Sequence, residues 1–174
     1  LWLLGNATTE VWWNSGNADF PFERVQAGFV QRGVASHYGA ALLDNSLAWI
    51  TADERGHPLA VHAVDGYQPQ VISPTNINWR WAQYSTWSDV FTYTYQIEGH
   101  EFWVVTFPTA NRTWVYDATT KQWHQWSSNI DNEPLSRHRS NCHAYAFGRH
   151  YVGDYNSGKI YTLEPAVYTE DGAA

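Results

Sequence analysis

The sequence is poor in cysteine, methionine and charge: its 174 residues include one cysteine and no methionine, and charged residues make up 16%. The single thiol, Cys142, cannot close a disulfide within the chain and leaves a cysteine-based zinc cluster without most of its ligands. Polar residues interrupt every apolar run well before the roughly 18 residues of a membrane-spanning helix. These absences predict a soluble protein without a membrane segment, whose fold depends on its hydrophobic core.

Basic residues are scarce as well, since 10 lysines and arginines stand against 17 aspartates and glutamates and the net charge is -7. Sequence-independent DNA binding depends on a basic surplus that neutralises phosphates, so tight nonspecific DNA binding is not expected. The chain opens inside an apolar run, Leu1–Leu4, without the basic region or cleavage site of a signal peptide. We therefore expect a portion of a longer protein.

Motifs of the common enzyme classes are missing too. No two glycines are separated by one residue and no Gly-Lys-Ser/Thr occurs, which argues against Rossmann and P-loop nucleotide sites. There is no Gly-x-Ser-x-Gly and no His-Glu-x-x-His, so the usual hydrolase signatures are absent. The sequence predicts no enzyme, no catalytic residues and no bound cofactor.

Aromatic residues, in contrast, make up 17% of the chain, and 11 of them are tryptophans. Apolar residues recur with period two in short runs bounded by Gly, Asn and Asp, the pattern of strands joined by tight turns. The clearest example runs from Val90 to Asp117 with a turn at Glu98–His100, and Gln122–Trp126 adds a fourth strand. This region predicts an antiparallel meander of four strands.

The same order of strands and turns recurs along the chain. The first turns fall at positions 44, 99 and 148, about 50 residues apart, close to the repeat length of propeller blades. We predict an all-β fold, a partial β-propeller of about three to four antiparallel four-stranded blades. The expected blade-like units span residues 1–25, 40–73, 90–127 and 142–170. Most of the aromatic rings should then fill the space between blades rather than form a binding platform.

One segment departs from the strand pattern. Ser73 can cap a helix with Pro74 at its first position, and Ile77, Trp81 and Tyr84 fall on one helical face. The alternation of Ile77, Trp79 and Trp81 would also suit a strand. We predict one short inserted helix at about residues 74–84.

Two clusters are candidates for a site. His138, Cys142 and His143 are the tightest group of metal-ligating residues, but neighbours on a strand point to opposite faces, so no metal site is predicted. The dense cationic stretch Arg137, His138 and Arg139 presents two guanidinium groups on one side if it is extended. We predict a partner contact there, with a salt-bridged loop as the alternative. Most acids lie in turns, where they can accept backbone amide hydrogen bonds.

Six short motifs occur in an order that resembles a known family. They are Phe20-Pro21-Phe22-Glu23-Arg24, Asp53-Glu54-Arg55-Gly56, Glu98-Gly99-His100, Thr106-Phe107-Pro108-Thr109-Ala110-Asn111, Arg137-His138-Arg139-Ser140-Asn141-Cys142 and Gly153-Asp154-Tyr155. The chain resembles the packaged-DNA stabilisation proteins of short-tailed phages of the P22 type, also called tail accessory or tail nozzle (hub) proteins. The likeness extends from about Glu10 to Asp171.

The resemblance implies a homohexameric structural component of the virion tail, assembled in the cytoplasm of the bacterial host. Such proteins attach below the portal and its adaptor ring, retain packaged DNA that passes through their lumen, and dock the tail needle and tailspikes. No catalytic residues belong to that role. Two alternatives remain from the residues alone: a carbohydrate-binding or glycoside-hydrolysing propeller, and a kelch-like interaction module.

Overall fold

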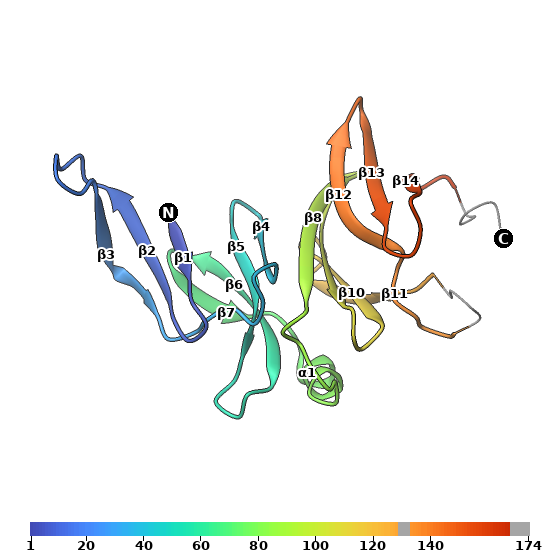
Figure 1. Cartoon of the computed structure of the whole chain (residues 1–174), viewed down its shortest axis with the longest axis horizontal. Coiled ribbons are helices and arrows are strands. Elements are labelled where there is room, and N and C mark those ends of the chain that lie inside the picture. Colours follow the sequence, from blue (N-terminus) through green and yellow to red (C-terminus); the bar gives the residue numbers. More distant parts are fainter. Residues whose placement is uncertain (129–132, 168–174) are drawn as a thin grey trace. The chain divides into compact units, whose positions relative to one another are not determined.

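The computed structural model describes residues 1–128 and 133–167 (Figure 1). The chain divides into two compact units, Leu1–Thr92 and Tyr93–Ala174. Four antiparallel sheets follow one another along the described chain, and each consists of strands that are consecutive in sequence. The predicted all-β class is confirmed. None of the helical segments in the described ranges is long and apolar enough to cross a membrane.

The first sheet has three strands in the order β1-β2-β3. Their bounds are β1 (Trp2–Leu4), β2 (Thr9–Asn14) and β3 (Phe22–Val30). One face carries buried Val11 and Val30, and the pairing of β2 with β3 shifts between Glu10 and Trp12. β3 extends past position 25, where the predicted unit ended, because Gln26, Ala27 and Gly28 break the apolar alternation without breaking the strand.

The second sheet has four strands in the order β4-β5-β6-β7. They are β4 (Ala40–Leu43), β5 (Ser46–Ala52), β6 (Pro58–Asp65) and β7 (Gln68–Val71). Trp49, Val61 and Ala63 are fully buried and form its core, against which Trp2 and Leu4 of the first sheet pack. The rings of Trp2 and Trp49 lie 6.2 Å apart, so an aromatic contact joins the first two sheets.

A short helix, α1 (Thr75–Trp81), follows the second sheet. Ile77 and Trp81 are buried, whereas Trp79 is 66% exposed. This burial pattern fits the predicted helix and not the alternative strand, in which all three residues would lie on one face. The predicted capping was wrong in detail: Pro74 is the N-cap residue, and no side chain caps the helix. The Ser73 hydroxyl instead accepts a hydrogen bond from the buried amide of Ala60, 2.9 Å away, because a strand amide would otherwise lack a partner.

The third sheet has four strands in the order β11-β10-β9-β8. They are β8 (Phe91–Ile97), β9 (His100–Phe107), β10 (Arg112–Asp117) and β11 (Gln122–Trp126). Adjacent residues Trp103, Val104 and Val105 of β9 are all fully buried, so both faces of this strand are covered. Burial on both faces is typical of a strand in the interior of a fold.

The fourth sheet has three described strands in the order β12-β13-β14. They are β12 (Ser140–Ala146), β13 (Arg149–Asp154) and β14 (Ile160–Leu163). Leu163 packs against a cluster of Tyr95, Val104 and Val115 from the third sheet. The predicted four-stranded unit at 142–170 would need one more strand after β14, but Val167 is not in a strand and Tyr168 lies outside the described residues.

The first hairpins of the last three sheets share one tight turn. Both central residues have positive φ in each case: Asp44 and Asn45, Glu98 and Gly99, and Phe147 and Gly148. Two consecutive positive φ angles give the turn the twist of the flanking strands. The turns expected at positions 44, 99 and 148 are therefore confirmed, and their common geometry explains why the repeat is visible in a sequence without verbatim repetition.

Candidate functional site

The predicted partner contact lies just before β12, and its arginines have partners within the chain. Arg137 is buried, with its guanidinium carbon 3.3 Å from the centroid of the Tyr155 ring. Arg139 forms an ion pair of 3.4 Å with Asp154, whose side chain is fully buried. Arg139 thus contacts the last residue of β13, and Arg137 contacts the residue that follows it. A contact of this stretch with another protein stays a prediction.

His138 is held by a short chain of hydrogen bonds. The Tyr93 hydroxyl donates to Ser140 Oγ at 2.7 Å, and Ser140 Oγ lies 2.7 Å from His138 Nδ1. Because the backbone amide of Ser140 also donates to Nδ1, at 3.3 Å, this nitrogen is an acceptor and the imidazole is neutral. Burial, together with the nearby Arg139 charge, lowers the pKa of His138 to about 4. This histidine is a structural group at neutral pH.

His138, Cys142 and His143, the metal-ligating residues that lie closest in sequence, do not converge on one point in the described structure. Cys142 is exposed, whereas the next residue along β12, His143, stacks on Tyr93 with ring centroids 5.5 Å apart. His143 Nε2 instead lies 3.0 Å from His150 Nδ1, and burial followed by the His150 charge lowers the pKa of His143. Among the described residues no three His, Cys, Asp or Glu side chains form a group suited to a metal ion.

Three acids in turns accept hydrogen bonds from backbone amides, as the sequence predicted. Asp53, Asp117 and Asp154 each take a hydrogen bond of 2.9 Å from the amide two residues later. Burial alone would raise the pKa of each carboxyl, but these and further hydrogen bonds outweigh it and lower the pKa. Asp117 also lies 2.7 Å from His100 Nδ1. These three acids therefore shape turns.

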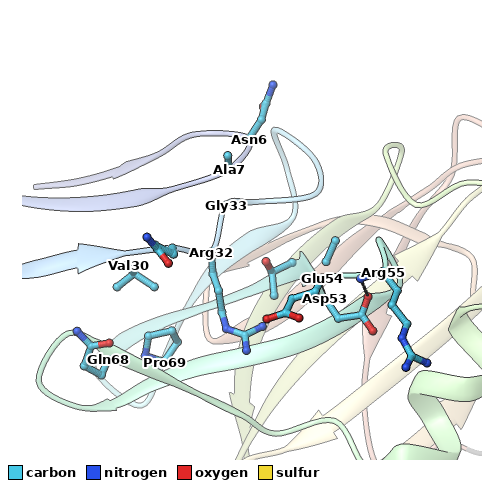
Figure 2. A pocket seen from close by; sticks show the side chains of 13 residues that line it. Asn6, Ala7, Val30, Arg32, Gly33, Asp53, Glu54, Arg55, Gln68 and Pro69 are labelled. Carbon is cyan, nitrogen blue, oxygen red and sulfur yellow. Dashed lines mark hydrogen bonds between the residues drawn. The ribbon is translucent and has the colours of Figure 1, made fainter.

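An open groove of about 800 Å³ lies in the first unit, and the sequence did not predict it (Figure 2). Four backbone segments line it: the β1–β2 turn, the end of β3 and the residues after it, the β5–β6 turn, and the start of β7. Its charged side chains are Arg32, Asp53, Glu54 and Arg55. No aromatic ring lines it, so this groove lacks the flat stacking surface on which sugar rings commonly bind.

The groove escaped sequence analysis because its residues are scattered between positions 6 and 69. Of its charged residues, only the Asp53–Arg55 stretch belongs to a motif that the sequence singled out, and Arg32 stands in no motif. Only the packing of the first sheet on the second brings these residues together.

Comparison with known proteins agrees with this architecture. A family model described as "Bacteriophage P22 Gp10, beta-propeller" matches residues 1–168. No curated protein matches the chain. The matched range includes all four sheets and the helix between the second and third.

Proposed function

Because this chain belongs to the family of the bacteriophage P22 Gp10 β-propeller, a phage structural and DNA-stabilisation protein, we propose that it is part of a phage tail nozzle. In this role it attaches below the portal and its adaptor ring and retains the packaged genome. It also docks the tail needle and the tailspikes. The observation that carries the proposal is the family match over residues 1–168.

The proposed assembly is a ring of six copies, formed in the host cytoplasm and carried in the virion. Four consecutive small sheets support such a part, since a rigid β-scaffold can present loops to several partners at once. Buried rings such as Trp49 and Trp103 are consistent with a mechanical role, because they fill the core rather than line the groove. The proposed role involves no turnover of a substrate.

The charge of the chain supports a channel wall that does not hold DNA. A net charge of -7 provides no surplus of cations to neutralise phosphates, so DNA can move past the wall without binding tightly. We place an acidic or neutral surface on the lumen side. Retention then results from closing the exit and not from affinity for the genome.

A genome-retention assay with the full-length parent protein tests this function. Phage heads filled with DNA in a host that lacks the protein are incubated with or without the purified protein, and nuclease-resistant DNA is measured over time. We expect heads without it to lose DNA and heads with it to keep DNA. Equal retention in both samples would contradict the proposal.

A further inference from the structure

The groove in the first unit contains two arginines that differ from the others in the chain. Arg32 and Arg55 have no ion-pair partner within the residues that the structure describes. Every other arginine is engaged: Arg24, Arg112, Arg139 and Arg149 form ion pairs, Arg137 stacks on Tyr155, and Arg80 has interactions of its own. In a chain with 17 acids and only 10 basic residues, this leaves two groove arginines without an ion pair among the described residues.

The backbone around Arg32 is fixed on both sides. The carbonyl of Arg32 accepts a hydrogen bond of 2.7 Å from the hydroxyl of buried Thr9, and the Val34 amide donates to the Gly5 carbonyl at 2.9 Å. Gly33 packs so closely on Asn6 that a methyl group there would overlap the Asn6 backbone. The half-buried Arg32 therefore starts from a defined position and extends toward the opposite turn (Figure 2).

The turn that carries Arg55 is equally well defined. Asp53 Oδ1 accepts hydrogen bonds from the amides of Arg55, at 2.9 Å, and His57, at 2.7 Å. The Asp53 amide donates to the His57 carbonyl at 2.8 Å, which closes the turn. Both arginines are thus presented by ordered backbone, so binding a ligand costs little further ordering of the main chain.

The other side chains of the groove define what it can bind. Guanidinium groups bind carboxylates or phosphates through paired hydrogen bonds, and the amide side chains of Asn6, Gln31 and Gln68 can bind a polypeptide backbone. Asp53 and Glu54 lie on the same turn as Arg55, so the groove has mixed charge and disfavours a ligand that carries a charge on every unit, such as a nucleic acid strand. An extended polypeptide in which carboxylates alternate with neutral residues fits better, because its backbone can bind the amide side chains and its carboxylates can pair with the two arginines.

We propose that this groove is a docking site for an extended acidic segment of a partner protein, whose carboxylates pair with Arg32 and Arg55. The volume of about 800 Å³ suits several residues of such a segment, since ligand sites typically measure roughly 300–1,000 Å³. This inference rests on the proposed docking role and deepens it, because it names the surface and the chemistry of the partner segment.

A fluorescence anisotropy titration of the full chain tests the docking site. The probe is a short fluorescein-labelled peptide in which aspartate alternates with serine, and its counterpart carries asparagine in place of aspartate. We expect saturable binding of the aspartate peptide, and binding about tenfold weaker for the Arg32→Gln, Arg55→Gln double variant. Arg149→Gln is the matched control, because its arginine is exposed and lies outside the groove.

Several results would overturn the assignment: no binding of the aspartate peptide, equal binding of the two peptides, or equal loss in the Arg149→Gln control. Labelled duplex DNA that bound more tightly than the peptide and depended on the same two arginines would show a nucleic-acid site instead. Matching thermal unfolding curves for wild type and variants exclude loss of folding as the cause.

The peptide titration and the genome-retention assay can fail separately. Retention by the wild-type protein without peptide binding overturns only the docking site. Peptide binding that depends on Arg32 and Arg55, without any effect of the protein on retention, contradicts the tail function and leaves the groove as an acidic-peptide site.

Discussion

His138 should make the stability of the second unit depend on pH. Its Nδ1 accepts hydrogen bonds from the amide and hydroxyl of Ser140, and its ring lies 5.1 Å from that of Trp126. Protonation of Nδ1 would remove both acceptor interactions and place a charge beside Arg139. The neutral imidazole is therefore the form that fits the fold.

Stability is expected to fall as the pH drops through the titration of His138. The pKa is about 4 in the folded chain against an ordinary value of 6.5, so between these values the unfolded chain binds a proton that the folded chain does not. The loss from pH 7 to pH 4.5 should be on the order of 2 kcal/mol from this residue. Urea denaturation at the two pH values measures it.

A variant separates His138 from the other groups that titrate in this range. His138→Gln keeps an acceptor for Ser140 but has no proton to bind, so its stability should depend less on pH by the same amount. The exposed His37 provides the control, and His37→Gln should behave as wild type. Identical pH dependence in wild type and His138→Gln would contradict the assignment.

The ion pair of Arg139 with Asp154 should stabilise the fold. Arg139→Gln leaves the fully buried Asp154 carboxylate without its cation, although Asn156 and Ser157 still donate hydrogen bonds to it. We expect a loss of about 2 kcal/mol in the free energy of unfolding, measured by urea denaturation.

A surface pair is the comparison for this measurement. Arg149 and Glu164 are 3.6 Å apart, and their side chains are 62% and 40% exposed, so Arg149→Gln should cost less than about 0.5 kcal/mol. An Arg139→Gln variant as stable as wild type would show that Arg139 is not needed for folding. That outcome would favour the predicted partner contact at residues 137–139.

At the scale of single elements, the β12–β13 turn contains an unfavourable residue. Phe147 has a φ of 51° and its side chain is 96% exposed, so it adopts a left-handed conformation without gaining any burial. The left-handed region costs residues with a Cβ roughly 1–2 kcal/mol, and Asn-Gly is the preferred sequence for such a turn. Phe147→Asn should therefore raise the free energy of unfolding by about 1 kcal/mol.

Thermal or urea unfolding of two variants distinguishes the cause. Phe147→Ala removes the exposed ring but keeps a residue that disfavours positive φ, so little change is expected. Equal stabilisation by alanine and asparagine would mean that the ring, and not the backbone conformation, is unfavourable.

Sequence patterns predicted the helix and the turns correctly where the nearby residues alone determine the local structure. Ile77 and Trp81 identify the helix because both must reach the same core, and Asp44-Asn45 and Glu98-Gly99 mark turns because they tolerate positive φ. The capping of α1 was mispredicted because Ser73 has a competing partner in the Ala60 amide. That amide is 13 residues away, beyond the reach of a local pattern.

At the scale of the whole molecule, charge balance predicts how the chain behaves toward DNA. Nonspecific binders reach dissociation constants of roughly 1–100 µM at physiological salt through a basic surplus, which this chain with net charge -7 lacks. Anisotropy with a labelled duplex should show no saturation below about 100 µM protein at physiological salt. Saturable binding in the micromolar range, lost in Arg137→Ala, Arg139→Ala, would contradict this and the neutral lumen.

The candidate site could not be predicted from sequence, because it is a property of tertiary packing. Arg32 acquires its place through Thr9 and Asn6, which precede it by more than 20 residues, and it faces a turn from another sheet. The cationic stretch at 137–139 had the stronger local signal. Its arginines nevertheless contact Tyr155 and Asp154, which only the pairing within the fourth sheet brings near.

Within residues 1–128 and 133–167, every sheet is built from strands that are neighbours in sequence, and most hairpins are closed by a few residues. Such a sheet has low contact order, so it can form early in folding without waiting for distant parts of the chain. It can also be duplicated or deleted as one piece of a gene, because no strand is threaded through another sheet. A chain built in this way can gain or lose a whole sheet without disturbing the strand pairing of the others.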